Sequence, residues 1–146
     1  MIEQDGFLGI RFGEPLQAAH QKLSLHGFKF VKRENALPPL GRVLYKGLYE
    51  GFESQIHLEF LRNEFHRSRV EIQTNDSKKV QNLHKELSRK FGASERLTRS
   101  RQACTDDSPQ DPCFNMWAID DDTSIILDVA GNHEKPVIVL EIFRIF

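Results

Sequence analysis

The stretch FLGIRFGEPLQAAHQKL, residues 7–23, decides the fold because it places a strand, a glycine and an amphipathic helix in succession. We expect the strand to end near Phe12, with Gly13 as the helix N-cap and Pro15 in the first turn, where its missing N–H is no loss. Four helical positions spaced i, i+3, i+4 and i+7 share one face: Leu16, Ala19, His20 and Leu23. A helix with one such stripe is expected to pack on a sheet.

The order of strand, glycine and helix is also that of phosphate-binding turns. Such turns contain several glycines and usually a nearby lysine, whereas this one contains a single glycine. Glu14 adds negative charge in the first turn, which suits the helix dipole but repels a bound anion. We therefore interpret Gly13 as a structural residue and not as part of a ligand site.

A second stretch, NDSKKVQNLHKELSRKFG (residues 75–92), repeats this pattern. Asn75, Asp76 or Ser77 is predicted to cap a helix that ends at Gly92, as Gly27 ends the first one. The apolar face of this second helix contains Val80, Leu83, His84, Leu87 and Phe91. Strands follow each helix, so the chain is predicted to be a pseudo-repeat with halves of about 1–66 and 67–146.

These patterns predict an α+β fold in a single domain, residues 1–146. We expect one antiparallel sheet of roughly seven to nine strands with two helices on one face, and a repeating order β-α-β-β-β. In SQIHLEFL (residues 54–61), alternation directs Ile56, Leu58 and Phe60 to one face. The predicted contacts between helices and sheet come from Leu16, Leu23, Val80, Leu83, Leu87 and Phe91.

The composition narrows the class of protein. The chain has 146 residues, of which 39% are hydrophobic, so it is long and apolar enough for a core. A net charge of −1 gives no general attraction to nucleic acid. The longest apolar run, VIVLEIFRIF (residues 137–146), is too short and too charged to span a bilayer. The N-terminus lacks signal-peptide features, so we expect a cytoplasmic protein, or a periplasmic or secreted one from which a signal peptide has been removed.

The two helix stretches, with the strands after them, resemble small bacterial domains built from tandem helix-plus-meander units. The nearest architectures are the β-lactamase-inhibitor-protein-like fold and the small lipoprotein of the outer-membrane barrel-assembly machine. Unlike that lipoprotein, this chain has no cysteine near its start. The resemblance implies protein binding through a sheet face and no catalysis.

Cys104 and Cys113 flank the polar loop TDDSPQDP (residues 105–112). Two prolines bend this loop, so a disulfide between the two cysteines is favoured over two free thiols. No C-x₂-C pair is present, and zinc needs more ligands than two cysteines. We predict no metal and no cofactor here.

Three consecutive aspartates, Asp120–Asp122, are compatible with calcium or with a turn. The spacing and the glycine of an EF-hand loop are absent, and aspartate favours turns through hydrogen bonds to its own backbone. A turn is therefore predicted. The basic residues of 78–101 are interpreted as a solvated helix face, because no nucleic-acid-binding motif accompanies them.

His57 and His66 are predicted to lie on neighbouring strands, where they could face each other near Glu59. This group is the best catalytic candidate in the sequence. Neither Ser54 nor Ser68 is placed against a base by any local motif, so no catalytic residue is assigned.

The sequence also has more apolar strand positions than one sheet face needs. Tyr45 and Tyr49 share a strand face, Trp117 alternates with Met116, and the final strand (137–146) is apolar on both faces. Either the stretch RENALPPLGR (residues 33–42) covers the second face or another chain does. Under the second alternative, the binding residues are Tyr45, Tyr49 and Trp117.

We therefore expect a non-enzymatic protein-binding module that uses a sheet face, such as an inhibitor, an immunity-type protein or an assembly accessory protein. Its partner is expected to be another protein or a second copy in a homodimer, with no nucleic acid. The alternative is a small enzyme or ligand-binding domain with a cleft near His57 and His66. A secretion chaperone is a weaker alternative.

Overall fold

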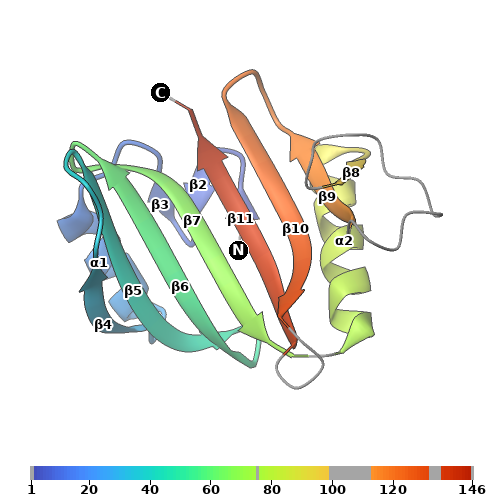
Figure 1. Ribbon diagram of the computed structural model, residues 1–146, viewed down its shortest axis with the longest axis horizontal. Helices are drawn as coiled ribbons and strands as arrows, with labels where there is room; N and C mark the ends of the chain where they lie inside the picture. Colours follow the sequence, from blue (N-terminus) through green and yellow to red (C-terminus); the bar gives the residue numbers. More distant parts are fainter. Residues whose placement is uncertain (1, 75, 99–112, 132–135, 146) are drawn as a thin grey trace.

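The computed structural model describes residues 2–74, 76–98, 113–131 and 136–145, and contains one large antiparallel sheet (Figure 1). Its eight strands lie in the order β4-β5-β6-β7-β11-β10-β9-β8. The strands of the first half are β4 (Lys29–Glu34), β5 (Leu40–Tyr49), β6 (Phe52–Leu61) and β7 (Glu64–Gln73). Those of the second half are β8 (Glu95–Thr98), β9 (Cys113–Ala118), β10 (Thr123–Gly131) and β11 (Pro136–Arg144). The α+β prediction is confirmed, and the eight strands of the large antiparallel sheet fall within the predicted seven to nine; a second, three-stranded sheet was not predicted.

Each half of the sheet is a four-stranded meander preceded by a helix. Helix α1 (Leu16–Leu25) precedes β4–β7, and helix α2 (Ser77–Phe91) precedes β8–β11. The last strands of the two halves, β7 and β11, pair with each other in the centre of the sheet. The structural repeat is therefore one helix followed by four strands. The predicted boundary between residues 66 and 67 falls inside β7, because a complete meander extends to Gln73.

The N-terminal segment differs from the single strand predicted before the first helix. Three short strands, β1 (Ile2–Glu3), β2 (Gly6–Phe7) and β3 (Ile10–Arg11), form a separate small sheet. Ile2, Phe7 and Ile10 are buried in the main core. The N-terminal sheet therefore closes one part of the core that the helices leave open.

Gly13 has a structural role, but it is not the N-cap of α1. Its φ is +93°, which favours glycine, and its N–H donates to the carbonyl of Phe65 at 2.9 Å. The N-cap is Pro15, whose side chain has no group that can accept a hydrogen bond. Asn63, in the turn between β6 and β7, supplies that group, because its Oδ1 accepts the N–H of Leu16 at 3.1 Å. Helix α2 is capped as predicted by Asp76, whose Oδ1 accepts the N–H of Lys78.

Both helices pack on the same face of the sheet. The strand register places Val43, Leu58 and Ser68 in one row across β5, β6 and β7. The same row continues through Ile142 and Ile125 to Trp117 in β9. All six predicted helix residues belong to this core, three of them buried and three partly buried against it: Leu23, Leu83 and Leu87, and Leu16, Val80 and Phe91. The predicted helix–sheet packing is confirmed.

Tyr45, Tyr49 and Trp117 are in this core, where they are 0%, 4% and 1% exposed. The hydroxyl of Tyr45 is hydrogen-bonded to Nδ1 of His20 at 2.8 Å, and the ring of Tyr49 stacks on Phe7. The expectation that they are exposed binding residues is corrected by this burial. Their strand faces are the ones that the helices and the N-terminal sheet cover, so these large side chains fill the core.

Strand β11 is apolar on both faces, as predicted. Ile138, Leu140 and Ile142 are in the main core, whereas Val139 and Phe143 lie on the opposite face. The stretch RENALPPLGR does not cover that face. Half of it belongs to β4 and β5 at the far edge of the sheet, and Leu37, in the connection between them, is 84% exposed.

Candidate functional site: the charged groove on the open face

The face of the large sheet opposite both helices is called here the open face. Figure 1 views the sheet with α1 and the N-terminal strands behind it. The open face of β4–β7 is polar because the outward-facing positions of β6 and β7 are mostly polar residues. Ile56 and Leu58 point into the core, and His57, between them, points to the open face.

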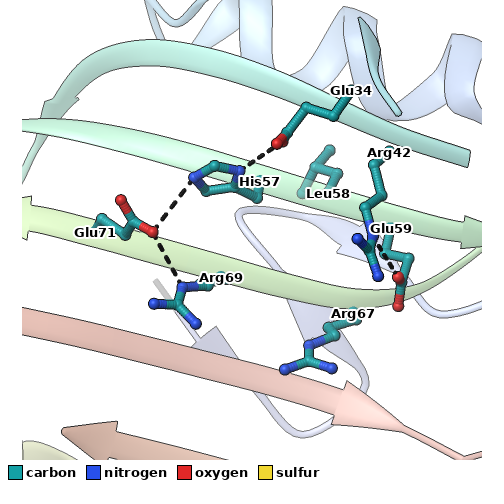
Figure 2. A pocket seen from close by; sticks show the side chains of 8 residues that line it. All are labelled: Glu34, Arg42, His57, Leu58, Glu59, Arg67, Arg69 and Glu71. Carbon is teal, nitrogen blue, oxygen red and sulfur yellow. Dashed lines mark hydrogen bonds and ion pairs between the residues drawn. The ribbon is translucent and has the colours of Figure 1, made fainter. Parts of the chain in front are cut away.

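A shallow groove of about 310 Å³ crosses the open face and is called here the charged groove (Figure 2). It is lined by Glu34, Arg42, His57, Leu58, Glu59, Arg67, Arg69 and Glu71. Strands β4, β5, β6 and β7 all contribute residues to it. Antiparallel neighbours bring these side chains together, because the polar position of each strand faces the polar position of the next.

His57 lies between two carboxylates at the centre of the charged groove. Its Nδ1 is 2.5 Å from Oε1 of Glu34, and its Nε2 is 3.5 Å from Oε1 of Glu71 (Figure 2). An imidazolium has a donor on each ring nitrogen, so its charged form matches both carboxylates. The neutral ring matches only one of them. The arrangement therefore fixes the orientation of the ring.

Two arginines and two glutamates continue the network toward β11. Arg69 Nε is 3.1 Å from Oε1 of Glu71, and Arg69 Nη1 is 3.4 Å from Oε1 of Glu141. Nη2 of Arg67 donates to both carboxylate oxygens of Glu141 at 3.0 Å. The Glu141 side chain is only 7% exposed, so these two arginines compensate a charge that is largely removed from water.

Glu59 forms the other end of the network. Its Oε1 accepts from Nε of Arg42 at 2.7 Å, and its Oε2 is 3.0 Å from Nε2 of His66. His66 is the extra residue of a β-bulge, because Glu59 pairs with Arg67 whereas Phe60 pairs with Phe65. The expected approach of His57 to His66 is corrected here, since the residue opposite His57 is Arg69. Glu59 does lie near His66, as predicted.

The chemistry available in the charged groove is ionic. Its lining contains carboxylates, guanidinium groups and one imidazole, but no hydroxyl, thiol or amine. Ser68 is buried on the helix side of the sheet, and Ser54 donates to the carbonyl of Phe52 at 3.0 Å. Neither serine is placed against His57. Among the described residues, no group of three or more His, Cys, Asp or Glu side chains is arranged to hold a metal ion.

A second groove, of about 510 Å³, lies beside the charged groove and is called here the lysine groove. Its lining consists of Gly27, Lys29, Lys46, Gly47, Leu48, Glu53, Ser54, Gln55 and Gln73. The two grooves adjoin because Gln55 and Glu71, one from each lining, are directly opposite in β6 and β7.

The open face becomes apolar toward β9, β10 and β11. Phe114 and Val139 are buried there, and Met116, Ile126 and Phe143 are half-buried. The guanidinium of Arg67 lies 5.7 Å from the ring centre of Phe143, where the charged and apolar parts meet.

The predicted turn at Asp120–Asp122 is confirmed. Oδ1 of Asp120 accepts the backbone N–H groups of Asp122 at 2.8 Å and Thr123 at 2.7 Å. The hydrogen bond from the Asp122 backbone is the main reason that the pKa of Asp120 is lowered. The predicted disulfide is a different case. Cys104 lies outside the described residues, as does the side chain of Cys113, so the disulfide stays a prediction.

The sequence pointed to His57, His66 and Glu59 but missed most of this site. The missed residues are Glu34, Arg42, Arg67, Arg69, Glu71 and Glu141. One signal was available, because the alternation that sends Ile56 and Leu58 inward sends the polar residues of β6 and β7 outward together. The contributions of β4, β5 and β11 depend on register, which the alternation of single strands does not give.

No family model matches the chain, and neither a curated protein nor a solved structure is significantly similar to it. The resemblance to tandem helix-plus-meander domains therefore stays a prediction. Within the described residues, neither helix has the length and apolar character needed to cross a membrane.

Proposed function

We propose that this protein is a non-enzymatic binding module that uses the open face of its sheet to bind another protein. One observation carries the proposal: two helices and the N-terminal sheet cover one face, whereas the other is left with a wide network of oriented charges. This network is not needed for such a fold to close its main core, since the main core lies on the helix side of the sheet.

The charged groove is suited to recognition because its side chains are already held in place. Each of its three glutamates contacts an arginine or a histidine of the same network. Groups held in this way lose little conformational entropy when a partner binds. Charged networks of this kind add specificity and association rate more than they add affinity. The adjoining apolar strip at Met116, Ile126 and Phe143 supplies apolar surface that a partner can bury, which contributes affinity.

This proposal differs from the sequence-based hypothesis in its residues. Burial removes Tyr45, Tyr49 and Trp117 as contact residues, so the charged groove takes their place. Arginine is enriched among the residues that dominate binding energies, and the side chains of Arg42, Arg67 and Arg69 are 41–47% exposed.

A small ligand-binding or catalytic cleft at His57 is the second candidate. The observation that favours it is the position of this histidine inside a groove, between two carboxylates. The missing nucleophile and the shallow shape of the groove favour protein binding instead. The two candidates differ in what must contact the groove, which is a protein chain in one case and a small molecule in the other.

Site-specific photocross-linking separates them. A photoreactive p-benzoylphenylalanine replaces Gln55, which lies between the two grooves, or Gln17, which is exposed on α1. We expect position 55, in the native cell, to cross-link a protein chain that position 17 does not. Equal cross-linking from both positions, or none from position 55, would contradict the proposal. The mass of the cross-linked product from position 55 also distinguishes a second copy of this chain from a different protein.

A further inference from the structure

We infer that the lysine groove is an anion-recognition site for an acidic segment of the partner protein. This inference rests on the proposed function and names the chemistry that the open face recognises. Its central residues are Lys29 and Lys46, with amide groups from Gln55 and Gln73 beside them.

Lys29 and Lys46 are directly opposite each other in β4 and β5. Side chains at opposite positions of an antiparallel pair are neighbours on the same face, and like charges in these positions are destabilising. Among the described residues, no acidic side chain forms an ion pair with either lysine. A bound carboxylate between the two ammonium groups would remove this repulsion.

The rest of the open face makes this pair distinctive. Glu34, Glu59, Glu71 and Glu141 are all in contact with arginine or histidine in or beside the charged groove. An incoming acidic group would have to compete there with carboxylates that already neutralise the arginines. No ion pair among the described residues neutralises Lys29 or Lys46 in the lysine groove. An anion can therefore bind there without competing with a carboxylate of the protein.

The lining of the lysine groove extends the site beyond two charges. Gln55 is opposite Lys46 in the register, and its amide can donate to the same anion. Glu53 also lines the groove, so its net charge is one positive unit. That balance favours a flexible segment that places one or two carboxylates between the lysines over a highly charged polyanion.

A simpler role for these lysines is to protect the edge of the sheet, because β4 is an edge strand and edge lysines oppose strand-to-strand association. That role predicts no anion binding. It does predict that removal of the lysines promotes self-association, which can be measured on the same proteins.

The test uses a fluorescein-labelled hexaglutamate peptide and measures its anisotropy with the full chain at low ionic strength. We expect the double variant Lys29→Gln/Lys46→Gln to weaken peptide binding about tenfold or more. The matched control, Lys78→Gln/Lys85→Gln, removes two exposed lysines from α2 and changes the net charge equally. It should bind as the wild type does. Equal weakening in both double variants, or no binding to the wild type, would overturn the inference.

Inorganic phosphate is the second probe, because the same lysines could hold a free anion. If phosphate competes with hexaglutamate no better than chloride at the same ionic strength, the site recognises acidic protein segments. If phosphate displaces the peptide at much lower concentration, the site takes a free phosphate and the inference of an acidic segment is wrong. Light scattering on the Lys29→Gln/Lys46→Gln protein then measures its self-association, which increases if the lysines protect the sheet edge.

Cross-linking from position 55 separates this inference from the proposed function. If cross-linking persists in the Lys29→Gln/Lys46→Gln background, the open face binds a protein without the lysine groove, and only the inference fails. If the wild-type background gives no cross-link while hexaglutamate still binds through the two lysines, the anion site stands and the proposed function fails.

Discussion

The indole Nε1 of Trp117 donates a hydrogen bond to the carbonyl oxygen of Gly92 at 3.0 Å. Gly92 is the C-cap of α2, so this contact connects the end of the second helix to the C-terminal end of β9. The ring of His84, also in α2, packs against the Trp117 ring with 5.4 Å between the ring centres. The second repeat therefore orients its helix through one side chain of its own meander.

Trp117→Phe should lower the free energy of unfolding by about 1–3 kcal/mol, because it removes this hydrogen bond and leaves a small void. Urea titration followed by circular dichroism measures the change. Met116→Leu, at the neighbouring half-buried position on the other face, keeps its volume and should cost about 1 kcal/mol or less. A larger loss in Met116→Leu than in Trp117→Phe would contradict the structural role of the indole.

Leu87→Ala should cost about 2–5 kcal/mol of folding free energy, because Leu87 is buried where α2 packs on the sheet. The measurement is the same urea titration. Lys85→Ala, two residues away on the exposed side of α2, is the control and should change stability by about 0.5 kcal/mol or less. Similar values for the two variants would place α2 away from the core.

Gly47→Ala should destabilise the protein by about 1–3 kcal/mol, because the new Cβ would lie 2.4 Å from Cδ1 of the buried Phe28 ring. Gly41→Ala in the same strand meets no atom within 4 Å and should be neutral or slightly stabilising. In a Phe28→Leu background the cost of Gly47→Ala should fall. An unchanged cost there would show that the ring is not the cause.

Both tyrosines should resist ionisation in the folded protein. Burial raises the pKa of Tyr45, and burial followed by the charges of Glu50 and Glu86 raises that of Tyr49. Because the folded-state values are raised, their contribution to stability is complete below the unfolded pKa of about 10 and is lost as pH rises above it. The ultraviolet absorbance of tyrosinate measures this ionisation directly, because the chain contains only these two tyrosines.

In the native protein we expect tyrosinate absorbance to appear together with alkaline unfolding, detected by circular dichroism. In denaturant both side chains should titrate near pH 10. A native-state titration near pH 10 with no loss of structure would mean that the tyrosines are accessible to solvent. Tyr45→Phe and Tyr49→Phe, measured singly, assign each step.

Local patterns predicted most of the elements but not their assembly. Leu83 and Leu87 share a helical face whatever the fold, and Ile56 and Leu58 share a strand face, so these pairs were identified correctly. The three N-terminal strands were missed because each has two residues, which is too short for alternation to show. Pro15 was placed inside the first turn although it is the N-cap, because Asn63, which accepts the N–H of Leu16 and caps the helix, is distant in sequence.

Tyr45 and Tyr49 were predicted to be exposed because the sequence does not show which face of the sheet is covered. Alternation shows that Tyr45 and Tyr49 share a face, but the neighbours in β6 and the N-terminal Phe7 decide whether that face is buried. The charged groove depends on register in the same way. Glu141 meets Arg67 and Arg69 only because β11 pairs with β7, a contact between the two halves that no local pattern contains.

The pairing of β7 with β11 has a consequence for synthesis on the ribosome. The last of the eight strands to be translated lies in the middle of the sheet, so the first meander emerges with β7 as an unpaired edge. Strands with free edges are prone to aggregate, and pairing over such a sequence distance slows folding. Arg67, Arg69 and Glu71 place charge along this temporary edge, which opposes aggregation of the nascent chain until β11 arrives.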